Sequence, residues 1–381
     1  MKLLHDCNRI NRILYKEYIK ELLEFLKSTG GINDIENYIK LLQSEYAKYI
    51  GTNHAFITNS GTSALQLSLL VLGVGKGDNV IIPDMTSKAT ALAVLSTGAN
   101  PVLADIKKSD LTIDEKDVEK KIDKKTKAIV PVHLFCQSCE MDTLMEMAEK
   151  YNLYIVEDAC QGHGGTYKKK MLGSFGELNA FSFNYYKSIS TFGGSGGIIT
   201  FNNASYYEKL ETLSKSDSIN PIELLRANFR RFEHISLFDA ITVRIKLKHA
   251  NLIKKSLDSI KKIYENELNE VNQINIFKDV YGTTSMRTIY AILAAKKDLL
   301  KNFLLRNSVM AEDFYIPISM LDMLEKSIVS NTKLKVSNEA YSFGLQLPMF
   351  PLMKKEEVYY ITDLIKKFYS VSRLKSLKKP W

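Results

Sequence analysis

Short apolar runs alternate with helical stretches along the chain between Thr52 and Asn203. Each apolar run is rich in β-branched residues and ends in small or polar residues, as buried strands do. The stretches between the runs have the length and the apolar periodicity of helices. The runs are His54–Thr58, Asn79–Pro83, Pro101–Asp105, Ala128–Leu134, Leu153–Glu157, Ala180–Phe183 and Gly197–Phe201. This alternation predicts an α/β fold in which seven strands, mainly parallel, form a sheet between helices.

Three helices are predicted between these strands, over Ala64–Val71, Thr90–Ser96 and Met141–Tyr151. Helices in such positions connect parallel strands by right-handed crossovers. Ligands of sheets built in this way bind at the carboxyl ends of the strands. The side chains that follow the strand ends are therefore the first candidates for a functional site.

The pattern differs on both sides of this region. Near the N-terminus, the spacing of Leu14, Ile19, Leu22, Leu23 and Leu26 predicts an amphipathic helix. Beyond the last strand come long, charged, helix-forming segments, a mixed region with Leu345–Pro351, and a final helix near Glu356–Phe368. A chain of this length usually exceeds one hydrophobic core. We expect an N-terminal helical segment (1–50) packed on a large α/β domain (51–205), and a smaller C-terminal α+β domain (206–381).

The composition is typical of a globular protein, with 45% hydrophobic and 25% charged residues among 381. The longest apolar stretches, such as Ala128–Phe135 and Ala89–Leu95, are much shorter than the roughly 20 residues that span a bilayer. Charged residues, including Asp6, Arg9 and Arg12, interrupt any signal-peptide core. We therefore expect a cytoplasmic protein without a membrane span.

The net charge of +9 does not by itself indicate nucleic acid, because no recognition motif accompanies it. Lys-rich stretches such as Lys246–Lys262 are typical of solvated helix faces. Cys136 and Cys139 form a Cys-x-x-Cys pattern, which can be a redox or metal motif. A zinc site needs more ligands at suitable spacing, and His133 and His163 alone do not supply them. We predict reduced, packed thiols, no metal and no nucleic-acid partner.

A turn of small polar residues follows the first strand and opens a helix, with the sequence Thr58-Asn59-Ser60-Gly61-Thr62-Ser63-Ala64-Leu65. Backbone N–H groups and the hydroxyls of Thr62 and Ser63 would converge on an anion there, assisted by the helix dipole. The turn is a candidate phosphate site. An ordinary Ser/Thr N-cap has the same pattern, so both interpretations stay open.

A second polar cluster follows the strand that begins at Leu153, and reads Glu157-Asp158-Ala159-Cys160-Gln161-Gly162-His163-Gly164. An acidic residue at a strand end can hold the cationic nitrogen of a heterocycle. Taken alone, Glu157 and Asp158 could equally bind a metal or cap a helix, and His163 could be a loop histidine.

The third motif contains a lysine. Gly173-Ser174-Phe175-Gly176-Glu177 precedes Ala180-Phe181-Ser182-Phe183-Asn184-Tyr185-Tyr186-Lys187, and Gly193-Gly194-Ser195-Gly196-Gly197 leads into the next strand. The lysine thus follows a strand end and precedes a glycine-rich turn. This arrangement gives a positioned amine beside a backbone that can approach a ligand closely.

In this order and at these separations, the three motifs resemble those of the DegT/DnrJ/EryC1/StrS aminotransferases. These are fold-type I enzymes that use pyridoxal-5′-phosphate (PLP) and are best known for aminating keto sugars attached to nucleotides. The resemblance runs from about Gly51 to Thr200 and reappears weakly at Leu345–Glu357. It implies that Lys187 forms the Schiff base with PLP and that Asp158 contacts the pyridine nitrogen. It assigns cofactor binding to Gly61, Thr62, Ser63, Asp158, Gln161, Ser182, Lys187 and Asn228.

The chemistry of these residue types agrees with the implied roles. Gln161 would lie against the cofactor ring near its 3-hydroxyl, while Thr62, Ser63 and Ser182 would hold the phosphate. A lysine amine of ordinary pKa, about 10.4, is a poor nucleophile near neutral pH unless it is desolvated or held as an imine. A carboxylate at Asp158 would keep the ring nitrogen protonated. Lys187, once released, would act as general base and then as general acid.

The sequence departs from the family pattern at three places. Ser87 stands where family members usually place an aromatic residue that stacks on the cofactor. The turn Gly193–Gly197 lacks the acidic residue that the family usually has there, and Cys136-Gln137-Ser138 replaces the usual Gly-Gln-Pro. The resemblance is also poor from about Ser216 to Lys246, which predicts a divergent substrate pocket.

The resemblance further implies a homodimer in which the two subunits share their active sites. A residue of the poorly matched segment would reach the partner's cofactor phosphate. Asn228, Arg230 and His234 are the candidates. The apolar residues between them, such as Phe229 and Phe232, are unusual for a solvated loop.

The leading functional hypothesis is transfer of an amino group from glutamate or glutamine to a keto sugar, for cell-surface polysaccharide or secondary-metabolite biosynthesis. One alternative is a PLP- or ligand-binding protein of the same fold that has lost turnover. Another is a PLP-dependent sugar dehydratase. Such dehydratases carry histidine in place of the lysine, and the presence of Lys187 argues against this reading.

Overall fold

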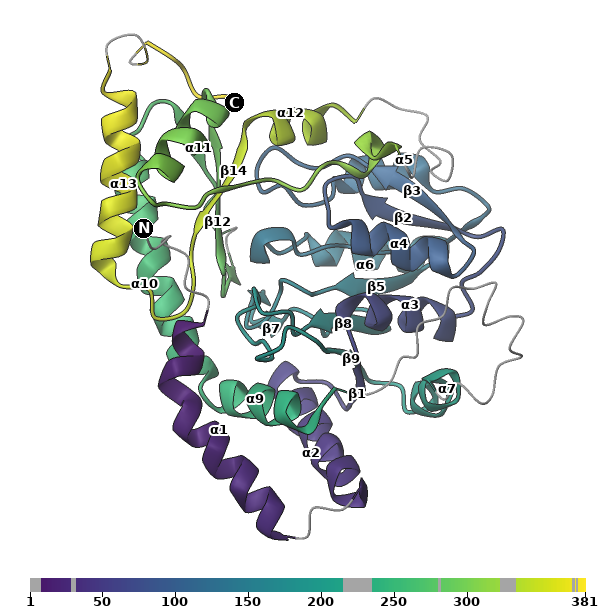
Figure 1. Ribbon diagram of the computed structural model, residues 1–381. Helices are drawn as coiled ribbons and strands as arrows, with labels where there is room; N and C mark the ends of the chain where they lie inside the picture. Colours follow the sequence, from purple (N-terminus) through teal and green to yellow (C-terminus); the bar gives the residue numbers. More distant parts are fainter. Residues whose placement is uncertain are drawn as a thin grey trace.

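The computed structural model describes residues 8–28, 32–214, 235–279, 282–322, 334–371, 374 and 376–381. Its larger sheet has seven strands in the spatial order β1-β9-β8-β5-β4-β2-β3 (Figure 1). They are β1 (His54–Thr58), β2 (Asn79–Pro83), β3 (Asn100–Ala104), β4 (Thr126–Ile129), β5 (Tyr154–Asp158), β8 (Leu178–Ser182) and β9 (Gly197–Phe201). Strand pairs are parallel except that β9 is antiparallel to both its neighbours. The expected α/β fold with a mainly parallel sheet is confirmed.

One predicted strand ends earlier than its apolar run. The run Ala128–Leu134 leaves the sheet after Ile129, and Pro131 follows two residues later. Proline has no N–H to donate to a ladder of hydrogen bonds, so it disfavours continued pairing. Val132 still forms an isolated bridge with Asp158, which keeps this segment beside the end of β5.

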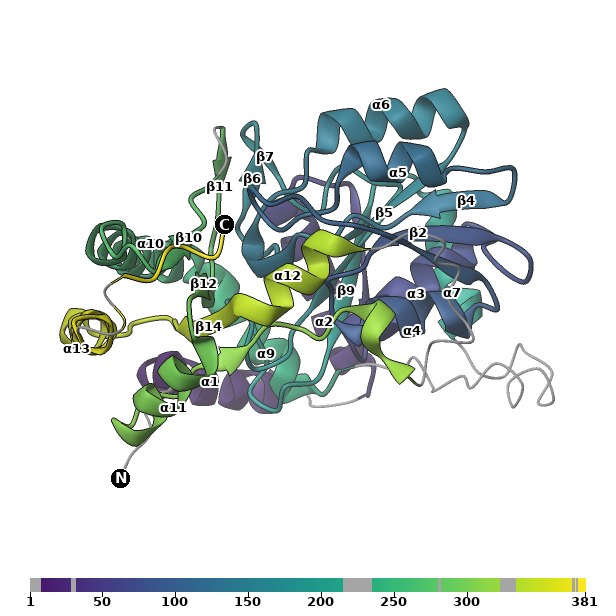
Figure 2. The ribbon, with the colours of Figure 1, turned by 90° about the horizontal axis from the view of Figure 1, so that it is seen from above.

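Helices cover both faces of the larger sheet (Figure 2). On one face lie α3 (Gly61–Val71), α4 (Lys88–Ser96) and α7 (Ser205–Ser214), and on the other lie α5 (Glu115–Lys121) and α6 (Met141–Tyr151). Successive side chains of a strand point to opposite faces. In β5, Val156 accordingly packs with residues of α3 and α4, while Ile155 packs with residues of α6.

The N-terminal part is helical, as expected, but contains two helices. These are α1 (Arg9–Ser28) and α2 (Ile32–Ile50); α2 packs against β1, and α9 (Leu237–Lys248) packs against both helices. Arg244 of α9 links them, because its guanidinium bonds Glu21 of α1 and Glu45 of α2, each at 2.7 Å. Arg244 is only 6% exposed, so these contacts belong to the packed interior rather than to the surface.

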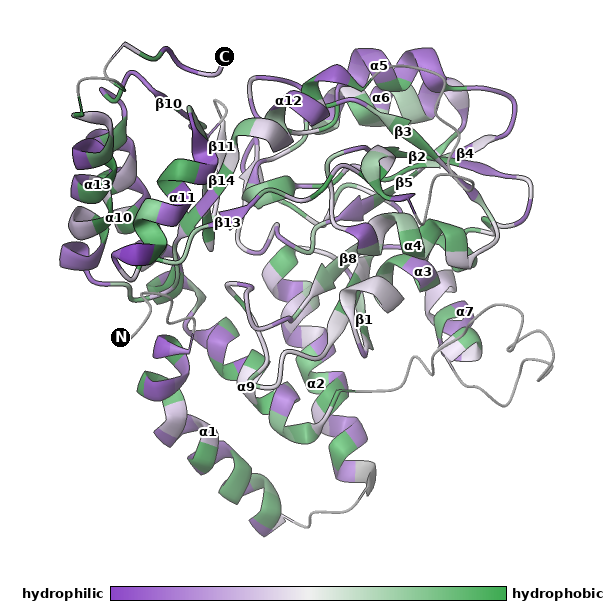
Figure 3. Ribbon diagram, turned by 45° about the horizontal axis from the view of Figure 1, so that its top comes forward, coloured by the Kyte–Doolittle hydropathy of each residue, from purple (hydrophilic) through white to green (hydrophobic). Residues whose placement is uncertain are grey.

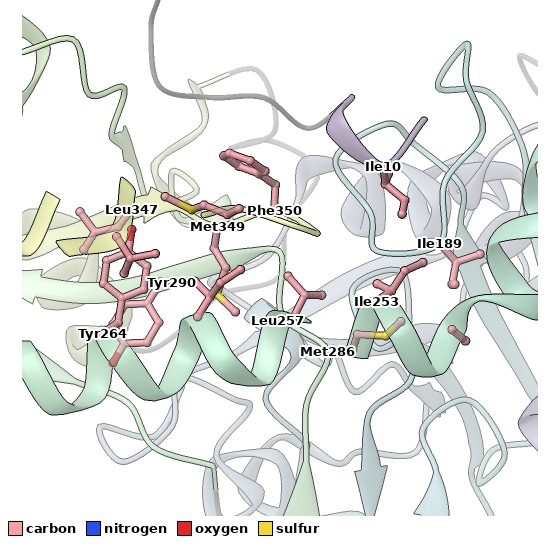
Figure 4. Packing of buried hydrophobic residues seen from close by; sticks show 14 of the residues in the cluster. Ile10, Ile189, Ile253, Leu257, Tyr264, Met286, Tyr290, Leu347, Met349 and Phe350 are labelled. Carbon is pink, nitrogen blue, oxygen red and sulfur yellow. The ribbon is translucent and has the colours of Figure 1, made fainter. Parts of the chain in front are cut away.

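A smaller antiparallel sheet has the order β10-β12-β14-β13. Its strands are β10 (Ile274–Ile276), β12 (Ile289–Ala294), β13 (Glu312–Asp313) and β14 (Gly344–Pro348), and its helices are α10 (Ala250–Leu268), α11 (Lys297–Arg306), α12 (Lys335–Phe343) and α13 (Lys355–Tyr369). The rings of Tyr264 on α10 and Tyr290 on β12 stack with centroids 4.6 Å apart (Figure 4). A third sheet joins β11 (Thr283–Thr284), β6 (Thr166–Tyr167) and β7 (Lys170–Met171).

The largest apolar core extends across the parts that the sequence separates. It includes Ile10 of α1, Tyr46 of α2, Ile198 of β9 and Leu345 of β14. Figure 3 shows hydrophobic strands in the interior and hydrophilic stretches on outward-facing helices such as α5 and α13. The division into residues 1–50, 51–205 and 206–381 remains a prediction.

Within the described residues, no helix is long and apolar enough to cross a membrane. Cys136 and Cys139 are buried free thiols. The Cys136 sulfur accepts the N–H of Met286 at 3.2 Å, and the Cys139 thiol donates to the carbonyl of Val132 at 3.2 Å. In the part of the chain that the structure describes, no group of three or more His, Cys, Asp or Glu side chains is arranged to hold a metal ion.

Candidate active site

A cavity of about 480 Å³ lies at the carboxyl ends of the strands of the larger sheet. Asp158 at the end of β5 and Ser182 at the end of β8 line it on one side. Glu312 of β13 and Gln346 of β14 line it from the smaller sheet. The cavity therefore lies where an open α/β sheet is expected to bind its ligand, and its volume suits a small cofactor or substrate.

Asp158 has a fixed orientation in this cavity. Its side chain is almost fully buried. Thr90 Oγ1 on α4 donates to Asp158 Oδ2 at 2.7 Å, and the N–H of Cys160 donates to Oδ1 at 3.2 Å. Bonds from neutral donors to a carboxylate are strong in a buried environment. Asp158 can therefore present a negative charge to a cationic group in the cavity without changing its own position.

The neighbouring acid Glu157 has a different role. Its fully buried side chain lies 2.8 Å from Nε2 of His133. It also accepts the N–H groups of Gly173 at 2.8 Å and Gly176 at 3.1 Å. Glu157 thus organises the turn that leads into β8, while Asp158 faces the cavity. Successive side chains of a strand point to opposite faces, so Glu157 and Asp158 lie on opposite sides of β5. This alternation is the sequence signal that distinguishes the two acids.

The start of α3 forms one end of the cavity. Gly61 and Thr62 line the cavity, and the first turn of a helix has N–H groups with no carbonyl partner inside the helix. A Cβ atom at Gly61 would lie 2.7 Å from Cβ of Ser182, so only glycine allows this close approach of α3 to β8. Ser60 and Ser182 add hydroxyls to the same wall, which makes it suitable for a phosphate.

Ser63 does not line this wall, although the sequence includes it in the phosphate site. Its N–H donates to Oγ of Ser60 at 3.1 Å, and its hydroxyl donates to Oδ1 of Asn59 at 2.6 Å. Ser60 is the N-cap residue of α3. The N-cap interpretation therefore holds for Ser60 and Ser63, while Thr62 lines the cavity and stays a candidate for the phosphate site.

Lys187 lies in the loop between β8 and β9 and lines the cavity together with Tyr186. Its N–H donates to the carbonyl of Asn184 at 2.8 Å. A buried lysine of α9 supports the same loop, because Nζ of Lys246 donates to the carbonyl of Ser190 at 2.9 Å and to its hydroxyl at 2.8 Å. The loop that carries Lys187 is therefore held from behind by α9.

An acidic residue contacts the glycine-rich turn although the turn itself has none. Asp239 of α9 accepts the hydroxyl of Ser195 at 2.9 Å and the N–H of Gly193 at 3.5 Å. It also accepts the hydroxyl of Ser236 at 2.9 Å. The sequence did not reveal this residue, because Asp239 lies 44 positions after Ser195 and no local pattern joins the two.

His163 lies behind the cavity. Its Nε2 lies 2.8 Å from the carbonyl of Ser182, and its Nδ1 lies 2.8 Å from Oη of Tyr46. The contacts fit a neutral imidazole that donates from Nε2 and accepts at Nδ1. Burial, together with the nearby charge of Lys187, lowers the pKa of His163 to about 3. His163 therefore supports the end of β8 as a neutral residue.

The amide of Gln161 is held at both ends. Its Oε1 accepts the N–H of Phe135 at 2.8 Å, and its Nε2 donates to Oη of Tyr315 at 3.0 Å. Gln161 and Tyr315 both line the cavity. Tyr315 follows β13, far along the chain, and sequence reasoning did not identify it.

The structure brings most of the predicted site residues to this one cavity. Those that line it are Gly61, Thr62, Asp158, Gln161, Ser182 and Lys187. Ser87 also lines it and caps α4, accepting the N–H of Ala89 at 3.3 Å. Asn228, Arg230 and His234 lie outside the described residues. Thr86 and Thr90, which reach Asp158 as a chain of hydroxyls, were missed by the sequence analysis.

These residues fit PLP. Gly61 lets the start of α3 pack closely on Ser182 and Cys160, which brings the helix N-terminus and the Ser182 hydroxyl to one wall of the cavity. Asp158 supplies a buried carboxylate and Lys187 supplies a primary amine on the wall of the same cavity. Phosphate, ring nitrogen and aldehyde of the cofactor thus each have a residue of suitable chemistry.

Comparison with known proteins agrees with this fit. Residues 13–366 match the DegT/DnrJ/EryC1/StrS aminotransferase family. The chain is 30% identical over 362 residues to GDP-perosamine synthase of Escherichia coli O157:H7, covering 93% of this chain and 95% of that protein. It is 30% identical over 329 residues to dTDP-3-amino-3,4,6-trideoxy-alpha-D-glucose transaminase of Streptomyces venezuelae, covering 86% of each.

A solved structure matches over nearly the whole length. The crystal structure of S. venezuelae DesV, in complex with a ketimine intermediate, has a TM-score of 0.87 and 27% sequence identity. The match covers 96% of this chain and 98% of DesV. As its motifs predicted, the chain belongs to the DegT/DnrJ/EryC1/StrS aminotransferase family, and it is a PLP-dependent aminotransferase.

Proposed function

We propose that the protein transfers an amino group from glutamate or glutamine to a nucleotide-linked keto sugar. Support for a nucleotide-linked sugar comes from the relatives over nearly the whole chain, one of which is named a GDP-perosamine synthase. Support for the chemistry comes from a single observation, the presence of Asp158, Lys187 and the start of α3 on one cavity. The choice of amino donor rests on the family resemblance.

We assign the following roles to the residues of the cavity. Bound PLP supplies the electron sink that stabilises negative charge on the substrate carbon. Asp158 would hold a proton on the ring nitrogen, with its own orientation fixed by Thr90. The Lys187 amine would take the proton from the α-carbon of the donor and later return one to the acceptor carbon. Gly61, Thr62 and Ser182 would hold the phosphate.

The working unit that we propose is a homodimer with shared active sites. Exposed apolar side chains near the lysine loop support the dimer, because a partner subunit could cover them. Phe192 is 55% exposed and Phe238 is 36% exposed, and their ring centroids lie 5.9 Å apart. Tyr185, two positions before Lys187, is also exposed. Asn228 would reach the partner's cofactor phosphate. The proposed cellular location is the cytoplasm, and the proposed pathway class is cell-surface polysaccharide or secondary-metabolite biosynthesis.

Separated half-reactions test this function. We expect glutamate or glutamine to convert PLP on the purified protein to pyridoxamine phosphate, and a nucleotide-linked keto sugar to restore PLP. Lys187→Ala is the matched control and should do neither, although it keeps the phosphate contacts. A wild-type protein that binds PLP at Lys187 but shows no conversion with any amino donor would instead be a binding protein. Restoration by free keto acids but by no keto sugar would contradict the proposed acceptor.

A further inference from the structure

Tyr315 connects the smaller sheet to the wall of the cofactor cavity. It lies two residues after β13, whose Glu312 and Asp313 pair with Gln346 and Leu345 of β14. Its hydroxyl accepts the amide N–H of Gln161 at 3.0 Å, across 154 positions of sequence. This bond therefore joins the two sheets at the cavity itself.

The ring of Tyr315 is held independently of this bond. It stacks on the ring of Phe135, with centroids 6.1 Å apart and planes 18° apart. Phe314, the preceding residue, is buried and contacts Phe135 at 4.8 Å between centroids. A Cβ at Gly344 would lie 2.2 Å from Phe314, so β14 also packs closely against this segment. The position of the Tyr315 hydroxyl is thus fixed by aromatic packing.

Gln161, in contrast, depends on its two partners for its orientation. Long side chains lose rotamer freedom when they are held, and each hydrogen bond offsets part of that cost. The N–H of Phe135 binds the amide oxygen, which leaves the amide nitrogen for Tyr315. Without the Tyr315 hydroxyl, the Gln161 amide has one partner and can rotate.

We propose that Tyr315 is a positioning residue, which fixes the amide of Gln161 against the bound cofactor and so makes the cofactor site sensitive to the placement of the smaller sheet. This inference rests on the proposed function, because it requires PLP in the cavity with its ring against Gln161. It adds a residue to the site, and it assigns to Tyr315 an action through Gln161 rather than direct contact with the reacting atoms.

A double-mutant cycle tests the proposal. Tyr315→Phe keeps the ring against Phe135 and removes only the hydroxyl, and Gln161→Ala removes its partner. The apparent Kd of PLP, measured by the visible absorbance of the bound cofactor, should rise about 3- to 10-fold in Tyr315→Phe, as expected for one lost hydrogen bond. Tyr315→Phe plus Gln161→Ala should bind PLP no more weakly than Gln161→Ala alone, because residues that act as one unit are not additive.

A second readout separates positioning from a general structural role. The pH midpoint of the visible absorbance of bound PLP should move in the same direction in Tyr315→Phe and Gln161→Ala, with no further change in the double variant. Tyr360→Phe is the matched control, because Tyr360 is exposed and its hydroxyl donates to the carbonyl of Asn307 at 3.1 Å. It should leave both quantities unchanged.

The outcomes are distinguishable from failure of the proposed function. If the wild-type protein does not bind PLP at Lys187, the proposed function fails and no cycle can be measured. If the wild type binds PLP but the two single changes multiply in the double variant, Tyr315 acts independently of Gln161 and the inference is overturned. A Tyr315→Phe variant identical to Tyr360→Phe in both readouts overturns it as well.

Discussion

The hydroxyl of Thr90 donates a 2.7 Å hydrogen bond to the carboxylate of Asp158. Thr90 lies on α4, which packs on one face of the larger sheet, and Asp158 lies at the end of β5. Thr90 is itself 3.0 Å from the hydroxyl of Thr86. Asp158 is the acid that we place against the ring nitrogen of PLP. Its position is thus set by α4 as well as by β5.

Replacing Thr90 by valine removes this donor at nearly constant volume. A hydrogen bond to a charged group contributes about 1.5–3 kcal/mol, so we expect the donor half-reaction to slow by about 10-fold or more. Rapid mixing of the PLP-bound protein with glutamate measures the rate. Thr212→Val is the control, because Thr212 is exposed and donates to the carbonyl of Glu208 within α7. Equal rates in the two variants would mean that Asp158 needs no support from α4.

Gly61→Ala tests the phosphate end of the cavity. The new Cβ would lie 2.7 Å from Cβ of Ser182 and 2.8 Å from the sulfur of Cys160. Overpacking of this kind costs about 1–3 kcal/mol, so PLP affinity should fall by about 10-fold as α3 and β8 separate. Gly75→Ala is the matched change, because its nearest neighbour, the carbonyl of Thr97, lies 3.8 Å away. Titration with PLP measures both variants, and unchanged affinity in Gly61→Ala would show that the phosphate binds elsewhere.

His163 should make folding stability depend on pH. Burial lowers its pKa in the folded protein to about 3, below the value of about 6.5 for an unfolded chain. Folding therefore favours the neutral form of His163. The resulting contribution to the free energy of unfolding is complete above pH 6.5 and is lost as the pH falls toward 3. His163→Asn should be less stable at pH 7.5 but lose less stability between pH 6 and pH 5, by roughly 1 kcal/mol. Chemical denaturation at each pH measures the free energy of unfolding. An equal loss in the wild type and in His163→Asn between pH 6 and pH 5 would contradict the buried neutral imidazole.

Subunit mixing tests the shared active site. Lys187→Ala should be inactive, and Asn228→Ala combined with Arg230→Ala should be inactive as well. Hybrid dimers would then contain one intact site, formed by the lysine of one chain and the segment of the other, and activity should return to about a quarter of the wild-type level if subunits mix at random. Full activity in a monomer, or no recovery despite verified subunit exchange, would count against sharing.

Most of the larger sheet could be predicted from the sequence because its strands are short apolar runs that end in turn residues. The helix Met141–Tyr151 was predicted with the bounds that the structure gives. The motifs at Gly61, Asp158 and Lys187 could be predicted to meet because strand ends of one sheet share an edge. The early end of β4 was not predicted, since the apolar run continues through Pro131 and apolarity alone does not report pairing.

The supporting residues could not be predicted, because they are joined to the site by packing rather than by local pattern. Tyr315 reaches Gln161 across 154 positions, and Lys246 reaches Ser190 across 56. Both lie outside Gly51–Thr200, the part of the sequence that carries the three motifs. In the sequence, Lys246 opens a lysine-rich stretch that is typical of a solvated helix face, yet the structure buries it completely. Only the arrangement of α9 behind the lysine loop explains that burial.

Reductive trapping tests the central claim most directly. Borohydride treatment of the PLP-bound protein should fix the cofactor covalently, and peptide mapping should locate the adduct on Lys187. Lys187→Ala, which retains Gly61, Thr62 and Ser182 for the phosphate, should bind PLP but release it on denaturation after the same treatment. An adduct on any other lysine of the wild-type protein would contradict the assignment of Lys187 and, with it, the mechanism built around this cavity.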